Sequence, residues 1–329
     1  MIDGDRFDSY YKEKLLPEII QFEQYRKLIL AKYRVWQFIH IIFISIFALI
    51  ILSFCAFTFA RQDLNYEVLY YLETLNLKNF LYLNIITVIA IILSREKMRK
   101  ILSNFSYAGK YQLFKKIIDA DGDMRYYPLS GIEVDTLIAS KLFSDFDRYK
   151  TKDYIQGEYK NLDVRLSEIE LIKIITSYQD SKMIEKEKDL FKGLFISVSM
   201  NKKFSSSTYI IPNYWMKIFN QFPGCSRVIL EDVEFEKAFD VYSSDQIEAR
   251  YILTTGFMER LVKVNRNFQI RCSFIEGQML IAITLEDGFM PILQLNQPLD
   301  YKIIKQVNQR INIIHELIDA LNLESNIGL

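Results

Sequence analysis

The sequence has 329 residues, of which 50% are hydrophobic and 25% are charged, and it contains 24 Phe and 21 Tyr residues. This composition is typical of a folded protein and excludes a disordered chain. The 41 Lys and Arg residues balance the 41 Asp and Glu residues. With a formal net charge of zero, no global field would attract nucleic acid, so we expect no nucleic-acid partner.

Residues 38–60, FIHIIFISIFALIILSFCAFTFA, form the first predicted membrane span. The run holds no charged side chain. As a helix it covers about 34 Å, enough for a hydrocarbon core of about 30 Å. Its side chains are apolar all round, which disfavours a buried soluble helix. A polar segment of mixed charge, residues 1–37, precedes it and disfavours a cleaved signal peptide.

Residues 79–94, NFLYLNIITVIAIILS, form a second and shorter apolar run. A helix of this length covers only about 24 Å, which does not separate a span from a core helix. Lys78 and Arg95 can extend their charged ends towards the headgroups, and Leu75 and Leu77 lengthen the run. The sequence therefore favours a second span over about 77–94.

The distribution of Lys and Arg around the two runs predicts their orientation. Four basic residues lie close before the first run and four close after the second, whereas the only basic residues of the connection at 61–78 are Arg61 and Lys78; the first two groups are Arg26, Lys27, Lys32 and Arg34, and Arg95, Lys97, Arg99 and Lys100. By the positive-inside rule both termini are cytosolic and the connection is a short outer loop. We expect an integral protein of the cytoplasmic (inner) membrane of a bacterium, with the lipid bilayer as its first partner.

Four segments follow from these patterns. We expect a cytosolic helical segment at 1–34 with a kink or break at Pro17, a transmembrane hairpin at 35–94, a juxtamembrane helix at 95–124 and a cytosolic domain at 125–329. Gly109 is a weak point of the juxtamembrane helix. Residue 222 is a point at which the cytosolic domain could divide into two sub-parts.

The cytosolic domain mixes period-2 stretches with amphipathic helices. The first part is expected to hold a turn at Tyr127 and Pro128, a helix near 132–143, strands within 157–178 and 191–200, and a mixed-charge loop at 181–189. Strands within 226–242 and a helix opened by Ser243, with Gln246 at capping-box spacing, are expected next. The last part is expected to hold a helix at 256–264, a hairpin at 267–285 that turns at Glu276 and Gly277, and a helix at 300–322. The strands join mostly through short turns. We therefore predict an α+β fold with antiparallel sheet.

Two stretches resemble a known family: FKGLFISVSMNKKF at 191–204 and EFEKAFDVYSSDQIEARYILTTGFMERL at 234–261. They are similar to the bacterial membrane-protein family catalogued as domain of unknown function 3137, as are PLSGIEVDTLIASKLF at 128–143 and DRYKTKDYIQGEY at 147–159. The resemblance implies a polar N-terminal helix, two adjacent spans and a C-terminal domain. It brings no established activity and no catalytic residues.

Common catalytic signatures are absent from the sequence. Its 11 glycines are never closer than nine positions apart, as at Gly122 and Gly131, so GxGxxG, GxxxxGK[ST] and GxSxG do not occur. His40 and His315 are the only histidines, which disfavours multi-His metal sites and His-based triads. We place His40 at the membrane interface and His315 at the surface or boundary of its helix. No cofactor and no catalytic residue is predicted.

The three cysteines, Cys55, Cys225 and Cys272, do not form a disulfide framework. We expect Cys272 to be a small core residue in a strand. A reactive thiol at Cys225 stays open, but no CxxC motif and no neighbouring His supports it.

Asp119, Asp121 and Asp123 are the best metal candidates, because alternating carboxylates can chelate Ca²⁺ or Mg²⁺. The calcium loop requires Gly at its sixth position and Glu at its twelfth, and this sequence has Met124 and Ser130 there. We expect instead a solvated turn that ends the preceding helix.

A second candidate cluster lies in the 234–261 block. Its polar members are Glu234, Glu236, Asp240, Asp245, Glu248 and Arg250. Two of these carboxylates could act as acid and base. Caps, solvent-facing helix residues and core residues explain the same letters.

Two hypotheses on function follow. The sequence favours a non-enzymatic, membrane-tethered module whose cytosolic domain binds a protein, itself membrane-bound or membrane-proximal, or a lipid surface; a homo-oligomer stays open. The alternative is a small-molecule sensor or a carboxylate-based enzyme with a pocket near residues 234–261.

Overall fold

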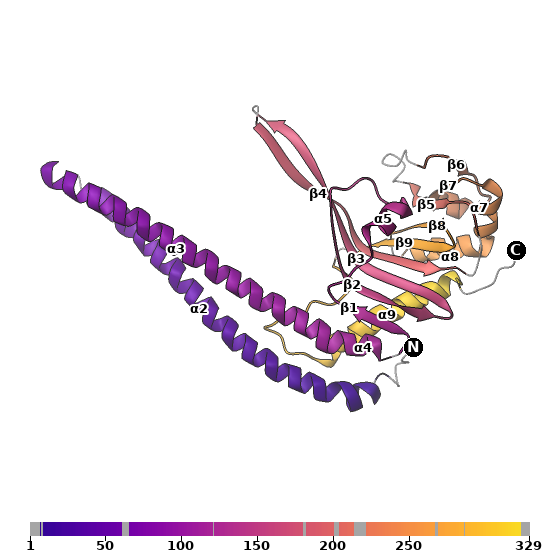
Figure 1. Ribbon diagram of the computed structural model, residues 1–329, viewed down its shortest axis with the longest axis horizontal. Helices are drawn as coiled ribbons and strands as arrows, with labels where there is room; N and C mark the ends of the chain where they lie inside the picture. The colour runs from indigo at the N-terminus through magenta and orange to yellow at the C-terminus, as the bar shows by residue number, and fades with distance from the viewer. Residues whose placement is uncertain are drawn as a thin grey trace. The chain divides into compact units, whose positions relative to one another are not determined.

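The computed structural model describes residues 7, 9–60, 66–120, 122–179, 182–200, 204–213, 222–266, 269–285 and 287–323. The chain divides into two compact units. One comprises residues 11–109 and 293–299 and is helical; the other comprises residues 110–292 and 300–329, with the N-terminal residues up to Tyr10, and contains the sheet. Figure 1 labels the elements of both units.

The helical unit is built from two long helices. They are preceded by a π-helical turn, η1, and their bounds are Tyr11–Leu15 for η1, Leu16–Ala60 for α2 and Tyr66–Gly109 for α3. The break expected at Pro17 does not occur, because Pro17 lies in the first turn of α2, directly after the wider π-turn. Both helices are long and apolar enough to cross a membrane. The second helix already begins at Tyr66, inside the segment expected to be a loop at 61–78.

The helices α2 and α3 pack against each other. The rings of Phe54 and Phe80 stack with centroids 4.0 Å apart, and His40 Nδ1 lies 2.7 Å from Ser94 Oγ. Most apolar side chains of the two runs are exposed on the outside of this pair. Such a surface is compatible with lipid as its solvent.

The segment 293–299 belongs to the helical unit through Arg26. The Arg26 guanidinium donates to the carbonyl of Leu295 at 2.6 Å and to both carboxylate oxygens of Glu23. Gly109 permits the close approach of Leu293, because an added Cβ would lie 2.1 Å from Leu293 Cδ1. The weak point expected at Gly109 is the last residue of α3, where the helix changes to a π-helical turn.

The second unit is built on a sheet of nine antiparallel strands, in the order β1-β2-β3-β4-β9-β8-β5-β7-β6. The strands are β1 Met124–Tyr127, β2 Arg148–Tyr159, β3 Leu162–Gln179, β4 Lys182–Ser199, β5 Thr208–Pro212, β6 Ser226–Val228, β7 Phe239–Ser243, β8 Ile270–Ile275 and β9 Gln278–Thr284. Its helices, after the π-turn η3 Lys110–Phe114, are α4 Lys115–Asp119, α5 Val134–Ser140, α6 Val233–Ala238, α7 Gln246–Ile252, α8 Thr255–Asn265 and α9 Tyr301–Leu321. The predicted α+β class is confirmed.

Helices cover both faces of the sheet. On one face Ile132 and Leu137, from the loop before α5 and from α5 itself, pack against Ile169, Phe195 and other buried side chains. On the other face the ring of Tyr159 stacks on His315 of α9, with centroids 4.1 Å apart. The position of His315 at the surface was therefore a wrong prediction: the apolar stripe of α9 faces the sheet and takes His315 with it.

Several local predictions are confirmed. The hairpin between β8 and β9 turns at Glu276 and Gly277, both of which have positive φ, as a type I′ turn requires. Cys272 is fully buried within β8. The helices expected at 256–264 and 300–322 are α8 and α9.

Three local predictions are wrong. The mixed-charge loop at 181–189 is strand from Lys182 onward, because its alternating charges fit a ribbon that is exposed on both faces. The strands expected within 226–242 are interrupted by α6, which Asp232 caps by accepting from Phe235 N–H. The helix after Ser243 is capped by Asp245, which accepts from Ile247 N–H and Glu248 N–H.

Candidate functional site

A polar cavity of about 540 Å³ lies on the α5 face of the sheet. Ligand pockets commonly have volumes of about 300–1,000 Å³, so the cavity suits a small molecule. It is lined by Tyr127, Ser130, Gly131, Ile132, Glu133, Thr136, Tyr154, Gln156, Arg165, Ser197 and Gln278. Most of these side chains are polar, and Arg165 and Glu133 are charged.

The floor of the cavity is a row of polar side chains that crosses four neighbouring strands. Gln156 of β2 pairs with Arg165 of β3, which pairs with Ser197 of β4. Directly paired residues of an antiparallel ladder point to the same face. Ser197 Oγ donates to Gln278 Oε1 of β9 at 3.0 Å, which completes the row. The row lies on the same face of the sheet as the apolar surface that α5 covers, and it forms the polar end of that face.

The row is rich in hydrogen-bond donors. The hydroxyl of Tyr154 donates to Gln156 Oε1 at 2.9 Å, and the hydroxyl of Ser197 donates to Gln278 Oε1. Both amide oxygens are therefore engaged, which leaves the amide NH₂ groups to donate to other acceptors. Arg165 has one ion-pair contact, from Nη2 to Asp163 Oδ2 at 2.7 Å, with both side chains half exposed. A guanidinium has five N–H donors, so this contact leaves others for a ligand.

The wall of the cavity is the segment between β1 and α5. Tyr127 and Ser130 bound a turn closed by Ser130 N–H donating to the Tyr127 carbonyl, as the Tyr-Pro dipeptide predicts. Gly131 brings this segment against β2, because an added Cβ would lie 1.9 Å from Thr151 Oγ1. Ile132 anchors it in the core. The wall is thus fixed to the same sheet that carries the floor.

Tyr154 lies between the two charged groups of the cavity. Burial raises the pKa of its hydroxyl, Arg165 lowers it, and the negative charges of Asp163 and Glu133 raise it further. Tyr154 therefore stays protonated and keeps donating to Gln156 at physiological pH. The influence of both Arg165 and Glu133 on one phenol places a positive and a negative group at the same cavity.

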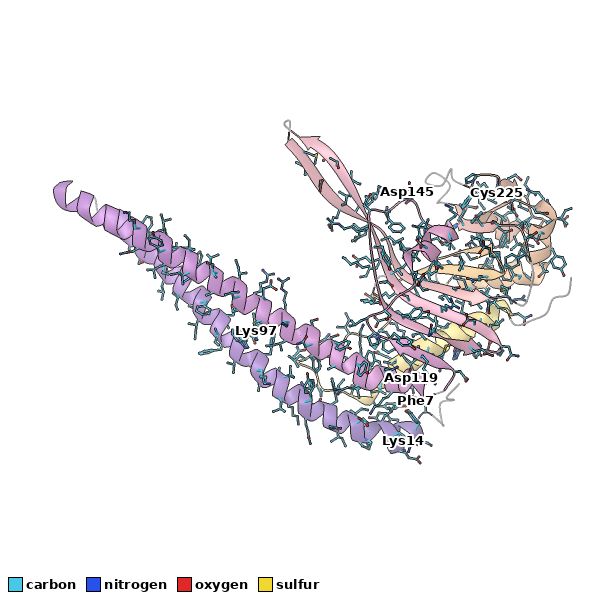
Figure 2. All side chains as sticks on the ribbon, in the orientation of Figure 1. Phe7, Lys14, Lys97, Asp119, Asp145 and Cys225 are labelled. Carbon is cyan, nitrogen blue, oxygen red and sulfur yellow. The ribbon has the colours of Figure 1, made fainter. Side chains whose placement is uncertain are left out.

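The metal candidates lie elsewhere. Asp119 is the last residue of α4 (Figure 2). Its two oxygens accept from Tyr126 N–H at 2.9 Å and from Lys115 Nζ at 2.6 Å. These contacts occupy the carboxylate within the chain. Asp121 lies outside the described residues. Within the part of the chain that the structure describes, no cluster of three His, Cys, Asp or Glu residues could hold a metal ion, Asp123 included.

Three members of the 234–261 cluster hold local structure. Asp245 caps α7. Glu248 accepts from Ser205 N–H at 3.0 Å and from Ser206 N–H at 2.7 Å, and so fixes the loop before β5. Arg250 donates to the backbone carbonyls of Gln246 and Ile229. These contacts are the ones that caps and loop anchors make.

The other three members lie near Arg227 and Lys237. Arg227 Nη2 lies 2.8 Å from Asp240 and 3.4 Å from Glu236. Burial raises the pKa of Asp240, Arg227 lowers it, and Glu236 raises it further. Glu234 is exposed, 3.6 Å from Lys237. None of the six predicted residues lines the polar cavity.

A second cavity, of about 460 Å³, lies between α8 and α9. It is mostly apolar, with Val264, Leu317 and Ala320 in its wall and Arg260 and Glu316 at its polar parts. It lacks the row of fixed donors that the first cavity has. The first cavity is therefore the better candidate site.

Sequence reasoning missed the polar row, because its four members come from segments up to 122 positions apart, from Gln156 to Gln278. One signal was present. Arg165 and Ser197 lie on the same face of their strands as the buried Ile169 and Phe195. Polar residues on the core-facing side of a strand indicate where the buried core ends and a polar cavity begins.

The fold and the cavity define a class of protein: an α+β domain with a donor-lined cavity, joined to two helices long enough to cross a membrane. Residues 189–323 match the family described as Protein of unknown function (DUF3137), which supports the resemblance to that family over this part of the chain. The match begins within β4 and ends at residue 323, and so includes Ser197 and Gln278 but not Gln156 or Arg165.

Known structures and curated proteins add little to this assignment. The crystal structure of the mycobacterial trehalose monomycolate transport factor A, TtfA, is similar at 10% sequence identity and a TM-score of 0.32, over 64% of this chain and 96% of that chain. A likeness of this degree supports no functional conclusion. No curated protein matches the chain.

Proposed function

We propose that the protein is a membrane-tethered binding module and that its polar cavity binds a small carboxylate. The observation that carries this proposal is the donor row of Gln156, Arg165, Ser197 and Gln278 across four strands. A carboxylate has only acceptors, and it matches a planar guanidinium flanked by amide NH₂ groups.

The charges of the cavity favour one carboxylate over a phosphate. Arg165 is its one cationic lining residue among those the structure describes, and Glu133 adds a negative charge to the wall. Both ligands would face Arg165 and Glu133, but a phosphate dianion carries up to twice the charge of a single carboxylate, so Arg165 balances less of its charge and Glu133 repels it more strongly. The volume of about 540 Å³ leaves room for further polar atoms of the ligand, beside Thr136 and Ser130.

A binding role fits the residues better than catalysis. The cavity has no His or Cys in its lining, and its one carboxylate, Glu133, has no carboxylate partner there among the described residues. Acid–base catalysis commonly uses a His or two carboxylates. The hydroxyls of Ser130, Thr136 and Ser197 have no base beside them within the lining. The cavity therefore holds groups that recognise a ligand and not groups that transform one.

The site can be tested with the full-length protein in lipid nanodiscs. Thermal unfolding is followed in the presence of a panel of mono-, di- and tricarboxylates of two to six carbons, their neutral amides, and inorganic phosphate. We expect at least one carboxylate to raise Tm while its amide does not. The Arg165→Gln variant loses the shift, and Arg266→Gln, a more exposed arginine outside both cavities, keeps it.

Three outcomes would overturn the proposal. If no carboxylate stabilises the protein, the cavity does not have this ligand class. If inorganic phosphate stabilises it more than every carboxylate, the ligand is a phosphate compound instead. A carboxylate shift that persists in Arg165→Gln would place the binding site elsewhere.

The tether and its orientation form the second part of the proposal. We infer that both helices span the cytoplasmic membrane of a bacterium with the sheet domain in the cytosol. Basic residues gather before the first apolar run and after the second, and they are sparse in the connection between the two runs. Single cysteines placed at 62–76 should react with an impermeant maleimide from outside the cell only. Labelling from the cytosolic side alone would reverse the orientation.

A further inference from the structure

The hairpin of β3 and β4 extends beyond the rest of the sheet as a two-stranded ribbon (Figure 1). Residues 173–179 pair with 182–188, whereas β2 pairs with β3 only as far as Ile172 and β9 pairs with β4 only from Gly193. We call residues 173–179 and 182–189 the β-arm. An isolated two-stranded hairpin is marginally stable in water, so a ribbon of this kind is a surface that gains from a partner.

One face of the β-arm is basic. Lys173 pairs directly with Lys188, and Ile175 pairs with Lys186, so the three lysines share a side. Like charges directly opposite each other destabilise a ribbon. Asp147 compensates Lys173 at 3.2 Å, but among the described residues no acidic group pairs with Lys186 or Lys188. The described part of the chain therefore provides no anion for these two lysines of the basic face.

The opposite face of the β-arm is acidic. Glu187 pairs with Ile174, Glu185 with Thr176, and Asp189 with Ile172. Side chains alternate between the faces of a strand, so these carboxylates all point away from the lysines. Arg148 from β2 reaches Glu187. Glu185 and Asp189 have no basic partner among the residues described.

The basic face also presents an apolar side chain. Ile175 is 45% exposed, beside Lys186. Across the ribbon, Met183 is exposed at 59%, on the strand that carries the acidic face. A surface that combines exposed apolar atoms with charges of one sign is typical of a docking face with a complementary partner.

We propose that the β-arm binds the β-arm of a second copy of this chain, with the basic face of one copy on the acidic face of the next. A second copy explains both faces at once, because each face meets the opposite charge. An anionic lipid surface would account for the basic face only and would repel the acidic one. The contact is heterologous, so it closes into a ring or continues as a row of molecules.

A membrane anchor would make such a contact effective. Copies held in one bilayer meet at a higher local concentration than free domains do, so a small charged contact is sufficient. Lysine–carboxylate pairs at an exposed surface are screened by salt. The association should accordingly weaken as ionic strength rises.

Charge exchange between the faces provides the test. The first variant, Lys186→Glu with Lys188→Glu, has two acidic faces; the second, Glu185→Lys with Asp189→Lys, has two basic faces. The control, Lys302→Glu with Lys305→Glu on α9, changes the net charge as the first variant does but leaves the β-arm intact. Full-length proteins with two different affinity tags are co-reconstituted in liposomes, extracted in mild detergent at low salt, and purified by one tag.

We expect wild-type copies and the control to co-purify, and each variant alone to lose about tenfold in recovered partner. A mixture of the two variants should co-purify at the wild-type level, because an acidic face again meets a basic one. This recovery also shows that both variants are folded. Carbodiimide cross-linking of mixed ¹⁴N and ¹⁵N wild-type copies should join Lys186 or Lys188 of one copy to Glu185 or Asp189 of another.

Three results would overturn the proposal. They are wild-type copies that do not co-purify, variants that self-associate as the wild type does, and a mixture that fails to associate. If wild-type copies stay separate while anionic lipid, compared with neutral lipid, slows acetylation of Lys186, the occupant of the basic face is the membrane surface.

Discussion

Lys110 Nζ lies 2.6 Å and 2.8 Å from the two carboxylate oxygens of Asp153, which is fully buried. Tyr126 donates its hydroxyl to the same carboxylate. Burial raises the pKa of Tyr126, and the charge of Asp153 raises it further, so the phenol stays protonated and keeps donating. The pair joins the π-turn η3 to β2, three residues before Gln156 of the donor row.

Replacement of Lys110 by Met should destabilise the protein by about 3–5 kcal/mol, because it leaves a buried carboxylate without its cation. Chemical unfolding of the sheet unit, followed by circular dichroism, measures the change. The double variant Lys110→Met with Asp153→Asn should be more stable than Lys110→Met alone, since the uncompensated charge is gone. Equal stability of the two variants would show that the pair contributes little.

Glu248 should make stability depend on pH. Partial burial raises its pKa, but the hydrogen bonds from Ser206 and Ser205 outweigh this and lower it below the ordinary value of 4.5. A lowered folded-state pKa means that the stabilisation is fully present above about pH 4.5 and is lost as pH falls through the folded value. The wild type should exceed Glu248→Gln by about 1–2 kcal/mol at pH 7, and by less at pH 3.5.

The control for this series is Glu231→Gln, which changes an exposed carboxylate. Its unfolding free energy should follow the wild type across the whole pH range. A constant difference between wild type and Glu248→Gln from pH 7 to pH 3.5 would contradict the assigned role of the Glu248 carboxylate.

Gly131→Ala should destabilise the protein by about 1–3 kcal/mol, because the new Cβ overlaps Thr151 and the wall must move. The same displacement should weaken carboxylate binding. Gly256→Ala in α8 is the matched control, since its Cβ meets only the end of the flexible Arg260 side chain at 3.1 Å. Thermal unfolding and ligand titration of both variants compare the two positions; equal effects would show that the wall does not need a glycine.

Glu133→Gln should strengthen binding of a dicarboxylate by about two- to fivefold, because a negative group leaves the wall of the cavity. A monocarboxylate of similar size should gain less. Calorimetric titration of both ligands gives the comparison. Weaker binding of both would show instead that Glu133 recognises a positive group of the ligand.

The sequence predicted the features that depend on local pattern. The apolar runs, the turn at Glu276 and Gly277 and the amphipathic stripe of α9 each lie within one segment, so their periodicity is visible in one dimension. Asp245 shows the limit of such patterns: Ser243 had the right spacing for a cap, but the carboxylate two residues later captured the N–H groups.

The candidate site could not be predicted in this way. Gln156, Arg165 and Ser197 meet only through strand register, which depends on how three separate segments pair. The β-arm was missed for a related reason. Alternating Lys and Glu at 185–188 look like a solvated loop, and only the pairing with β3 shows that the alternation separates two faces.

Calorimetric titration measures whether the polar row on the sheet binds a small carboxylate. The full-length protein in nanodiscs is titrated with the carboxylate that raises Tm most, beside Arg165→Gln and Arg266→Gln. We expect one ligand per chain, an affinity about 10–100-fold weaker in Arg165→Gln because a charge-assisted hydrogen bond is lost, and no change in Arg266→Gln. Equal affinity of the wild type and Arg165→Gln would contradict this expectation.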